Sequence, residues 1–534
     1  MKKILLTIML AASVLTACSD AYEAGDPTQR NDENIVFADA SEVARGVIGL
    51  YSSFNIESEI NFVSYFTDEL GVGVTNGGQG VNDGSYTFQI TPATDFVTSN
   101  WGGNMGLTNR ANRILSRIDV LLNETKDEAQ IASLKNSKAT VLALRAYAHY
   151  KLFAYYTPDY KDPNGLSVIK FDFLQTDDYD RLEPRSTVSE IVKFIEDDIK
   201  DARALGLNSV DNSEISESFL DAILVKLYSM TENYAGLEEA FNRLKEMHNV
   251  GSSQEYFTMF ADDAGAKLSN PDIIMRLERR VNQGGGVAGA WYSDRVGINA
   301  GMIFMELGRS LYNELDKLDP TYTGWALDKK DDQGNVIQTF DRYDVRFLTN
   351  VLSTSNVDTL YYNRSQDIFK TNDILLIGKY QGRTAAPLQN DVYVFRFTDM
   401  LLALAEKRAH DGQLTGAHTI GDYSNVESII YNIRANRNLI GSTPLSMPTN
   451  FNSSTEAYAR ILEERRLEFA FEGHRYLDMR RLGQKAGSQG FVRDAMDCAS
   501  TQACRLEANS YKLIFPIPST EIISNNKMVQ NPGY

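Results

Sequence analysis

A segment near the C-terminus, residues 460–483, concentrates the side chains that could do acid–base chemistry. It reads RILEERRLEFAFEGHRYLDMRRLG and places His474 two positions after Glu472. A general base needs a neighbouring group that orients it toward the reacting proton. Residues two positions apart on a helix face different directions, so this glutamate and histidine are poorly placed to act together. We therefore interpret His474 as a packed, hydrogen-bonded residue rather than a general base.

The charges of this segment recur at the spacing of neighbours on one helix. Four pairs of opposite sign lie three residues apart: Glu463 and Arg466, Arg465 and Glu468, Glu472 and Arg475, Asp478 and Arg481. Each such pair contributes roughly 0.2–0.5 kcal/mol, and an apolar face runs beside them. The pattern predicts a structural helix pair with its charges on solvated faces. Glycine is unfavourable inside a helix by about 1 kcal/mol, so we expect a helix break or close packing at Gly473.

Other signatures of catalysis are missing from the sequence. The five histidines form no HExxH pair, no GKS or GKT follows a glycine run, and no GxSxG motif occurs. Residues 328–335 are acidic but lack EF-hand spacing, so we expect no cofactor, with a weakly bound calcium ion left open. A carboxylate pair of a glycosidase cannot be recognised among 71 acidic residues. A lipid-anchored glycosidase therefore stays an alternative.

Composition places the chain among ordinary globular proteins. Hydrophobic residues make up 43% and charged residues 23% of the 534 positions. This length exceeds what one core usually holds, which predicts two or three lobes. With 53 basic and 71 acidic residues the formal charge is −18. Nucleic acid is not an expected partner, because phosphate binding needs a basic face.

The N-terminus predicts export and a lipid anchor. Lys2 and Lys3 precede an apolar run from Ile4 to Leu15, and Leu-Thr-Ala-Cys follows, ending at Cys18. The run is too short for a membrane span, which needs roughly 20 residues, but suits a secretory signal. The order of these features resembles a bacterial lipoprotein signal over residues 1–18, in which Cys18 becomes lipidated. A secreted protein without lipid is the alternative. Residues 19–39 are polar and predict a flexible tether.

Two further cysteines, Cys498 and Cys504, lie near the C-terminus. An exported protein permits a disulfide between them, which would close a short surface loop. Two thiols without a nearby histidine make a poor zinc site, so we favour the disulfide.

Apolar periodicity predicts a mainly α-helical fold built from helix pairs with short turns. No clean 34-residue repeat is present, so the tetratricopeptide-like character rests on the pairing alone. The middle of the chain, residues 251–391, differs: it has glycine-rich runs and a hairpin signal at residues 332–335. The predicted helices are residues 40–54, 108–122, 128–156, 187–205, 214–230, 234–247, 392–408, 426–439 and 455–483.

Several separated blocks resemble one known family. In chain order they are Trp101 with Arg110-Ala111-Asn112, LRAYAHYKLFAYY (144–156), YVFRFTDM (393–400), IRANR (433–437), ERRLEFAFEGHRYLDMRRLG (464–483), and the C-terminal FPIP and QNPGY. Together with the Leu-Thr-Ala-Cys motif they resemble the SusD/RagB outer-membrane lipoproteins of Bacteroidetes. The resemblance covers both ends of the chain and leaves out the middle. It implies helical regions at 40–250 and 392–534, a variable ligand-binding region at 251–391, and one integrated unit over 40–534.

The resemblance also implies a function without catalysis. Such proteins capture a nutrient, usually a glycan, at the cell surface and deliver it to a SusC-like TonB-dependent transporter. A peptide or other nutrient is the alternative ligand within the family. Aromatic rings that pack on sugar C–H groups would form the site. By region, the candidates are Trp101, Asn104, Trp291, Tyr292 and Trp325, with Tyr361 and Tyr362 in reserve, although buried packing roles for the tryptophans stay open.

Overall fold

The computed structural model describes the chain from residue 36 onward with several internal gaps. The described ranges are 36–73, 76–174, 181–260, 267, 269–279, 286–292, 303–320, 329–330, 336–338, 342–352, 375–380, 382 and 388–534. Within these ranges, no helix is both long and apolar enough for a membrane span. The signal sequence with Cys18 and most of the tether lie outside the described residues, as do Trp325, Tyr361 and Tyr362.

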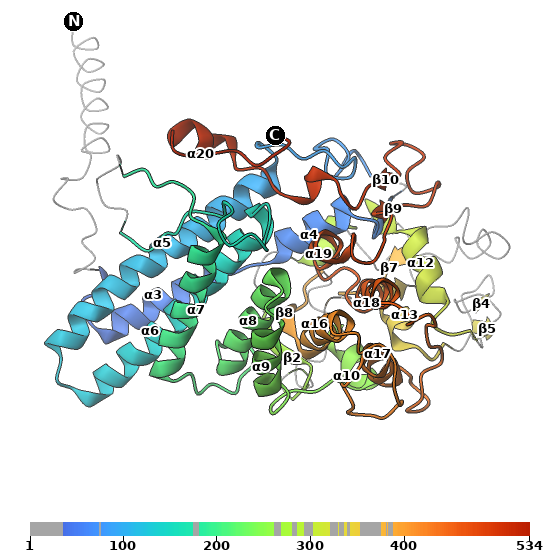
Figure 1. Cartoon of the computed structure of the whole chain (residues 1–534), viewed down its shortest axis with the longest axis horizontal. Coiled ribbons are helices and arrows are strands. Elements are labelled where there is room, and N and C mark those ends of the chain that lie inside the picture. Colours follow the sequence, from blue (N-terminus) through green and yellow to red (C-terminus); the bar gives the residue numbers. More distant parts are fainter. Residues whose placement is uncertain are drawn as a thin grey trace, which may run out of the picture.

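Long helices lying side by side form the N-terminal half (Figure 1). The longest predicted helix, residues 128–156, is confirmed in full, and it packs against the helices before and after it. Its second half buries alanines between aromatic rings, which lets neighbouring helices approach closely. The elements here are α3 (Ala40–Ser53), α4 (Glu57–Phe66), α5 (Asp95–Glu124), α6 (Glu128–Tyr156), α7 (Val188–Leu205), α8 (Glu217–Thr231), α9 (Tyr234–Leu244) and α10 (Ser253–Phe260).

Shorter helices form the remainder of the chain. They are η2 (Val287–Ala290), α12 (Arg309–Asp316), α13 (Val345–Asn350), α16 (Phe397–His410), α17 (Val426–Ala435), α18 (Ser454–Glu468), α19 (Arg475–Leu482), η5 (Tyr511–Leu513) and α20 (Ser519–Ser524). Helix α16 packs on α8 and α9 of the N-terminal half as well as on α17 and α18. The predicted mainly helical fold with packed helix pairs is confirmed.

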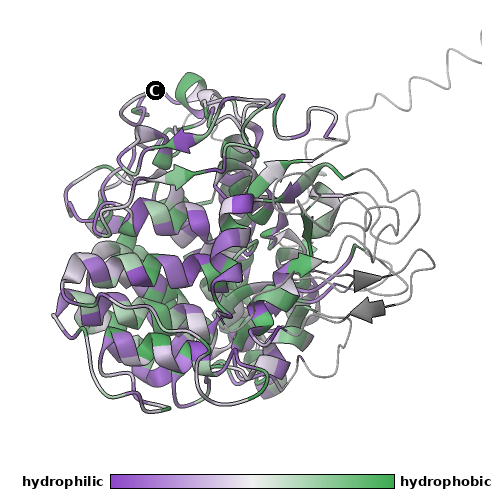
Figure 2. Ribbon diagram, turned by 90° about the vertical axis from the view of Figure 1, so that its right-hand side faces the viewer, coloured by the Kyte–Doolittle hydropathy of each residue, from purple (hydrophilic) through white to green (hydrophobic). Residues whose placement is uncertain are grey.

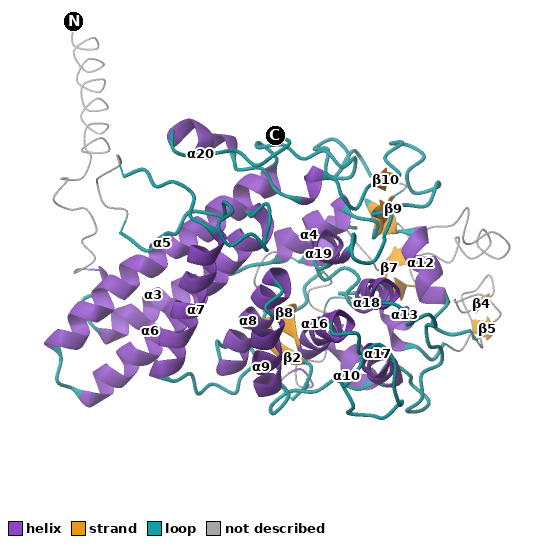
Figure 3. Ribbon diagram, viewed as in Figure 1, coloured by secondary structure: helices purple, strands orange, loops and turns teal. Residues whose placement is uncertain are grey.

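Strands are short and pair in twos, all antiparallel, between the helices (Figure 3). The pairs are β1 (Leu70–Val72) with β3 (Met305–Leu307), β2 (Ile273–Leu277) with β8 (Val392–Arg396), β4 (Lys329–Lys330) with β5 (Val336–Gln338), β6 (Val351–Leu352) with β7 (Leu376–Ile377), and β9 (Phe491–Val492) with β10 (Arg505–Leu506). The pairing of β4 with β5 agrees with the predicted hairpin, whose turn lies outside the described residues. Strands β1 and β2 each pair with a distant segment and so tie separate regions together.

Two predicted helices begin far from the expected residue. The helix predicted at 108–122 begins at Asp95, because glycines at 102, 103 and 106 hide its apolar periodicity. The helix predicted at 392–408 starts as strand β8, whose five residues are all buried. A continuous apolar run fits a buried strand as well as a helix, so periodicity alone could not separate the two.

The helix predicted at 455–483 is interrupted as expected near Gly473. Helix α18 ends at Glu468 and α19 begins at Arg475, with Phe471 at φ 62° and Gly473 at φ 83° between them. A left-handed backbone ends a helix, and glycine adopts it without steric penalty. The break turns the two charged halves in different directions, so they contact different parts of the molecule.

The hydrophobic core is continuous from α3 to the C-terminal segment. The helices in Figure 2 carry both hydrophilic and hydrophobic residues, as amphipathic helices docked on a core do. Near the C-terminus, Cys498 and Cys504 form the expected disulfide, with Cα atoms 5.2 Å apart. It joins the two sides of the loop between β9 and β10.

Candidate functional site

The charged segment at residues 460–483 is buried rather than solvated. The side chains of Glu464, Arg465 and Glu468 are at most 1% exposed. Of the four predicted pairs, Asp478 and Arg481 do contact each other, at 3.2 Å. The other three predicted pairs do not form. Glu463 instead pairs with Arg460, three residues earlier in the same helix, and both are partly exposed. The remaining charges pair with residues of other elements, so the prediction of solvated, within-helix pairs is wrong for them. Buried charges need close partners with satisfied hydrogen bonds, and distant elements supply these here.

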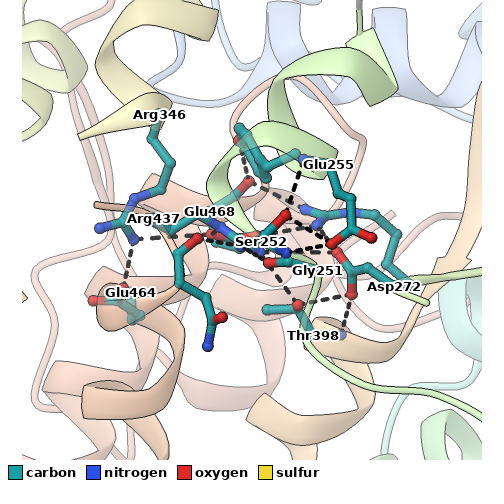
Figure 4. Close-up of polar contacts among 12 residues, drawn as sticks. Gly251, Ser252, Glu255, Asp272, Arg346, Thr398, Arg437, Glu464 and Glu468 are labelled. Carbon is teal, nitrogen blue, oxygen red and sulfur yellow. Dashed lines mark hydrogen bonds and ion pairs between the residues drawn. The ribbon is translucent and has the colours of Figure 1, made fainter. Parts of the chain in front are cut away.

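One network surrounds Glu468, at the end of α18 (Figure 4). Its carboxylate accepts hydrogen bonds from Arg437 Nη2 at 2.8 Å and from Arg396 Nη1 at 3.0 Å. Arg437 also donates to the carbonyl of Gly251 at 2.6 Å, and Arg396 donates to Asp272 at 2.7 Å. Burial alone would raise the pKa of Glu468, but the arginines hold it well below its usual range.

Further ion pairs extend this network across the molecule. Glu472 accepts from Lys379 Nζ at 2.6 Å and from Arg396 Nε at 2.9 Å. Arg475 donates to Asp68, in the loop between α4 and β1, at 2.8 and 2.9 Å. Asp68, Lys379 and Arg475 belong to the N-terminal, middle and C-terminal parts of the chain. The segment is therefore a structural junction between these parts.

The space beside this junction is too small for a substrate. A cavity of about 40 Å³ lies among Lys226, Asp399, Glu472 and His474. Since one water needs roughly 10–15 Å³ of such volume, the cavity has room for about three waters. The His474 ring stacks on Phe469 at 4.5 Å between centroids, and burial lowers the pKa of His474 to about 3. The interpretation of His474 as a packed residue is confirmed.

Trp101 and Asn104 lie within α5 rather than in a loop. The Trp101 ring is only 4% exposed and packs edge-on against Tyr156 at 4.9 Å. Its indole N–H donates to Glu521 of α20 at 3.2 Å. Asn104 is half-buried and donates to the Asn100 carbonyl of its own helix at 2.7 Å. A sugar needs an exposed ring face, so this structure does not support Trp101 as part of a platform.

Trp291 and Tyr292 are also buried. The Trp291 side chain has no exposed surface, lies 5.2 Å from the Phe471 ring, and donates its indole N–H to Ser64 Oγ at 3.2 Å. Tyr292 is 2% exposed. Trp291 thus anchors the middle region to α4 and to the helix break near Gly473, whereas the Tyr292 hydroxyl donates to the Ile377 carbonyl at 3.5 Å. Contrary to the prediction, neither ring presents a face to a ligand in this structure, because both are packed in the core.

The described edge of the middle region offers one aromatic side chain that the sequence did not single out. Tyr65, near the end of α4, is half-buried, and its hydroxyl donates to the Ala290 carbonyl at 2.5 Å. Gly80 of the glycine-rich loop lies against its ring, so closely that an added Cβ would be 2.2 Å from Cδ1. Tyr65 lies among the apolar residues of an amphipathic helix, so the sequence around it does not indicate that its ring is partly exposed.

The described surface carries open grooves but no metal cluster. One groove of about 690 Å³ lies between α9, α16 and the loop at Tyr423. A second, of about 270 Å³, lies between α19 and the segment 508–514. No group of three or more His, Cys, Asp or Glu side chains that could hold a metal occurs within the described ranges.

The fold and the buried ion pairs define a mainly helical protein in which the charged segment is part of the scaffold. The sequence model of the SusD family matches residues 248–534, more than half of the chain. A second model, described as "Starch-binding associating with outer membrane", matches residues 65–228. The chain belongs to the SusD family.

Individual relatives agree with this assignment. SusD-like protein P38 of Formosa agariphila is 24% identical over 405 residues, which cover 73% of each chain. A SusD superfamily protein of Bacteroides thetaiotaomicron has the same fold, with a TM-score of 0.69, 18% identity, and coverage of 92% of this chain and 100% of that one. A laminarin-binding SusD-like protein superposes with a TM-score of 0.60 at 18% identity, covering 93% and 100%.

Proposed function

We propose that this protein binds glycans at the outer surface of the cell and delivers them to a SusC-like TonB-dependent transporter. The observation that carries the proposal is the match of residues 65–228 to a family described as starch-binding and associated with the outer membrane. A structure with the same fold is that of a laminarin-binding protein, which supports a glycan as ligand. Binding without catalysis agrees with a charged motif that is locked in buried ion pairs.

The middle region is where we expect the principal ligand to bind. Its described frame is rigid: β1 pairs with β3, β2 pairs with β8, and Trp291 is buried beneath. Binding residues usually lie on loops that such a scaffold positions. Trp325, Tyr361 and Tyr362 stay the predicted aromatic contacts, and Tyr65 joins them as the described aromatic side chain at the edge.

Attachment and delivery form the second part of the proposal. Lipidation of Cys18 would anchor the chain to the outer membrane, and residues 19–39 would let the body stand away from it. We propose the regions 40–250, 251–391 and 392–534 as one integrated unit. A detergent-phase partition assay tests the anchor: the full chain should enter the detergent phase, whereas Cys18→Ala should stay aqueous.

A glycan panel tests the proposed ligand class. Pure protein is titrated with neutral and charged oligosaccharides, with unrelated peptides in parallel, and each mixture is then analysed for shortened products. We expect binding with Kd between about 1 mM and 1 μM and unchanged oligosaccharide. Peptide binding in place of glycan binding would favour the alternative receptor. Released sugar that disappears when one carboxylate is mutated would favour the glycosidase.

The transporter is tested separately by co-purification. The lipidated chain, expressed with a SusC-like transporter, should be recovered in one complex from solubilised outer membranes. If the chain binds glycan but never co-purifies with the transporter, the proposed ligand class stands and the proposed delivery to the transporter is wrong.

A further inference from the structure

A groove outside the middle region has the composition of a sugar-binding site. It has a volume of about 270 Å³ and lies between residues 158–161, the end of α8, helix α19 and residues 508–514. We call it the α19 groove. Pockets for drug-sized ligands are usually about 300–1,000 Å³, so the α19 groove suits a single sugar ring. All of its lining residues are described, and none belongs to the region 251–391.

An exposed aromatic ring lies at the edge of the α19 groove. Tyr511 is 44% exposed, which makes it unusual among the tyrosines of this chain, many of which are core residues. The ring is held in place from behind: Tyr534 packs edge-on at 5.0 Å, and an added Cβ at Gly533 would come within 2.4 Å of it. A ring that is both fixed and exposed is ready to pack against sugar C–H groups without further ordering.

The floor of the α19 groove carries a positive charge. Arg480 lies with its guanidinium carbon 4.2 Å from the centre of the Tyr160 ring. It donates to backbone carbonyls at the end of α6, including those of Ala154 at 2.7 Å and Thr157. These carbonyl acceptors are neutral, so they orient the guanidinium without cancelling its charge.

Lys161 and Lys485 add positive charge at the rim, and Asp159 and Glu232, which also line the groove, offset part of it. Glu232 lies 3.0 Å from Lys485 Nζ and 3.6 Å from Lys161 Nζ, so one carboxylate is shared between two ammonium groups. Glu232 ends α8 with φ 57°, a left-handed backbone that is uncommon for glutamate. This conformation lets it hold both lysines at the rim. Exposed Gln484 and Asn509 supply uncharged hydrogen-bonding groups beside them.

We propose that the α19 groove binds one anionic sugar residue, a uronate or a sulfate ester, as a second glycan contact. The sugar ring would pack on Tyr511, its anion would face Lys161 and Arg480, and its hydroxyls would bond to Asn509. The chain as a whole carries −18, so these local cations act against a repulsive field. Binding is therefore weak and depends on salt. The inference goes beyond the proposed function, because it needs no residue of the middle region.

The test uses the full mature chain and calorimetric titration. The probes are oligosaccharides of equal length that end in glucose, glucuronate or 6-sulfated glucose, with sodium sulfate as a bare anion. The variants are Tyr511→Ala and Lys161→Gln. Tyr431→Ala is the matched control, since this partly exposed tyrosine stacks on His418 away from the groove. Circular dichroism and thermal unfolding show that each variant is folded.

We expect a uronate- or sulfate-ended probe to bind at least tenfold more tightly than the glucose-ended one. Tyr511→Ala should weaken that binding at least tenfold, Lys161→Gln about threefold, and Tyr431→Ala not at all. The tighter of the two anionic probes shows whether the groove prefers a uronate or a sulfate ester. Equal binding of neutral and anionic probes, unchanged binding by a folded Tyr511→Ala variant, or sodium sulfate binding as tightly as the sugars would each overturn the proposal.

Trp325→Ala separates this inference from the principal function. The anionic probe should still bind this variant, with the same dependence on Tyr511. If Trp325→Ala no longer binds the anionic probe, the probe binds in the middle region, and the proposal of a site in the α19 groove is wrong. If only the anionic probe binds the wild-type protein, and Trp325→Ala binds it equally well, the middle region is not the glycan site and the α19 groove is.

Discussion

Glu468 pairs with two buried arginines, so neutralising its carboxylate should strongly destabilise the protein. Glu468→Gln leaves Arg396 and Arg437 buried with one of their carboxylate partners neutralised. Breaking a buried ion pair typically destabilises a protein by about 3–5 kcal/mol. We expect a loss of that order in the free energy of unfolding, measured by urea denaturation. The matched control is Glu239→Gln, whose side chain is 77% exposed and should change stability by less than about 0.5 kcal/mol. If both substitutions change the free energy of unfolding equally, Glu468 does not stabilise a junction between parts of the chain.

His149 should make stability depend on pH. Its Nδ1 contacts the Arg145 carbonyl at 3.1 Å and its Nε2 accepts the Phe171 N–H at 3.2 Å, so the neutral ring fits and the cation does not. Burial lowers its pKa to about 4, from 6.5 in the unfolded chain. The unfolded state therefore binds the extra proton first, and stability falls as pH decreases from 6.5 toward 4.

The size of this effect follows from the pH interval. Between pH 7.5 and pH 5, His149 should remove about 2 kcal/mol of stability, at 1.36 kcal/mol per unit below 6.5. Urea denaturation at both values should show a smaller decrease for His149→Gln than for the wild type. His418→Gln, at an exposed histidine, should behave like the wild type. Equal decreases in His149→Gln and the wild type would be inconsistent with a histidine held neutral by its surroundings.

At the scale of single residues, the type and charge of each side chain can be read from the sequence, but its burial cannot. The packed role of His474 and the Cys498–Cys504 disulfide could be predicted, because each followed from local spacing. Trp101 and Trp291 could not be placed, since a tryptophan has the same sequence signal in a core as at a sugar site. The partners of Glu468 lie 31 and 72 residues away, beyond any helix spacing.

At the scale of elements, two glycine substitutions should act in opposite directions. Gly473 has φ 83° at the break between α18 and α19, and an added Cβ would lie 3.2 Å from Ile60. Gly473→Ala should therefore destabilise the protein by more than about 1 kcal/mol. Gly102 lies in α5 with nothing near its would-be Cβ, so Gly102→Ala should stabilise by roughly 0.4–1 kcal/mol. Thermal unfolding gives both signs, and a stabilising Gly473→Ala would contradict the backbone assignment.

The disulfide should stabilise the contact between its loop and α12. Beside it, Asp497 accepts from the Arg309 N–H at 2.7 Å and from Arg309 Nη1 at 2.6 Å. A closed loop of seven residues is worth about 2 kcal/mol in the chain-entropy description. Changing both Cys498 and Cys504 to serine should lower unfolding stability by this amount and speed hydrogen exchange in α12. If hydrogen exchange becomes faster only in the β9–β10 loop, the disulfide does not stabilise α12.

Helices of strong periodicity were predictable, and boundaries set by long-range contacts were not. Residues 128–156 combine a capping aspartate, an unbroken apolar pattern and a following proline, so both ends were marked locally. Strand β8 is a strand because β2 pairs with it from 115 or more residues away, a contact that local propensity does not encode. The break at Gly473 was expected because glycine is the residue that most often ends a helix.

At the scale of the whole molecule, buried ion pairs and strand pairing connect regions that are far apart in the sequence. Asp68, Asp272 and Lys379 pair with Arg475, Arg396 and Glu472 of the C-terminal region, and β1 pairs with β3 of the middle region. A rigid frame of this kind leaves specificity to the loops it carries. The family of the chain was readable from its two ends, whereas residues 251–391, where we propose that the principal ligand binds, carry no motif.

Titration of the glycan panel against wild type and Trp325→Ala, with product analysis, tests the central claim of glycan capture most directly. We predict that at least one oligosaccharide binds the wild type, that Trp325→Ala weakens this binding at least tenfold, and that every oligosaccharide is recovered intact. Trp291→Phe, which keeps a buried ring at its position, is the control and should bind normally if it folds. Absence of glycan binding by the folded wild-type protein, or shortening of a bound oligosaccharide, would contradict the account.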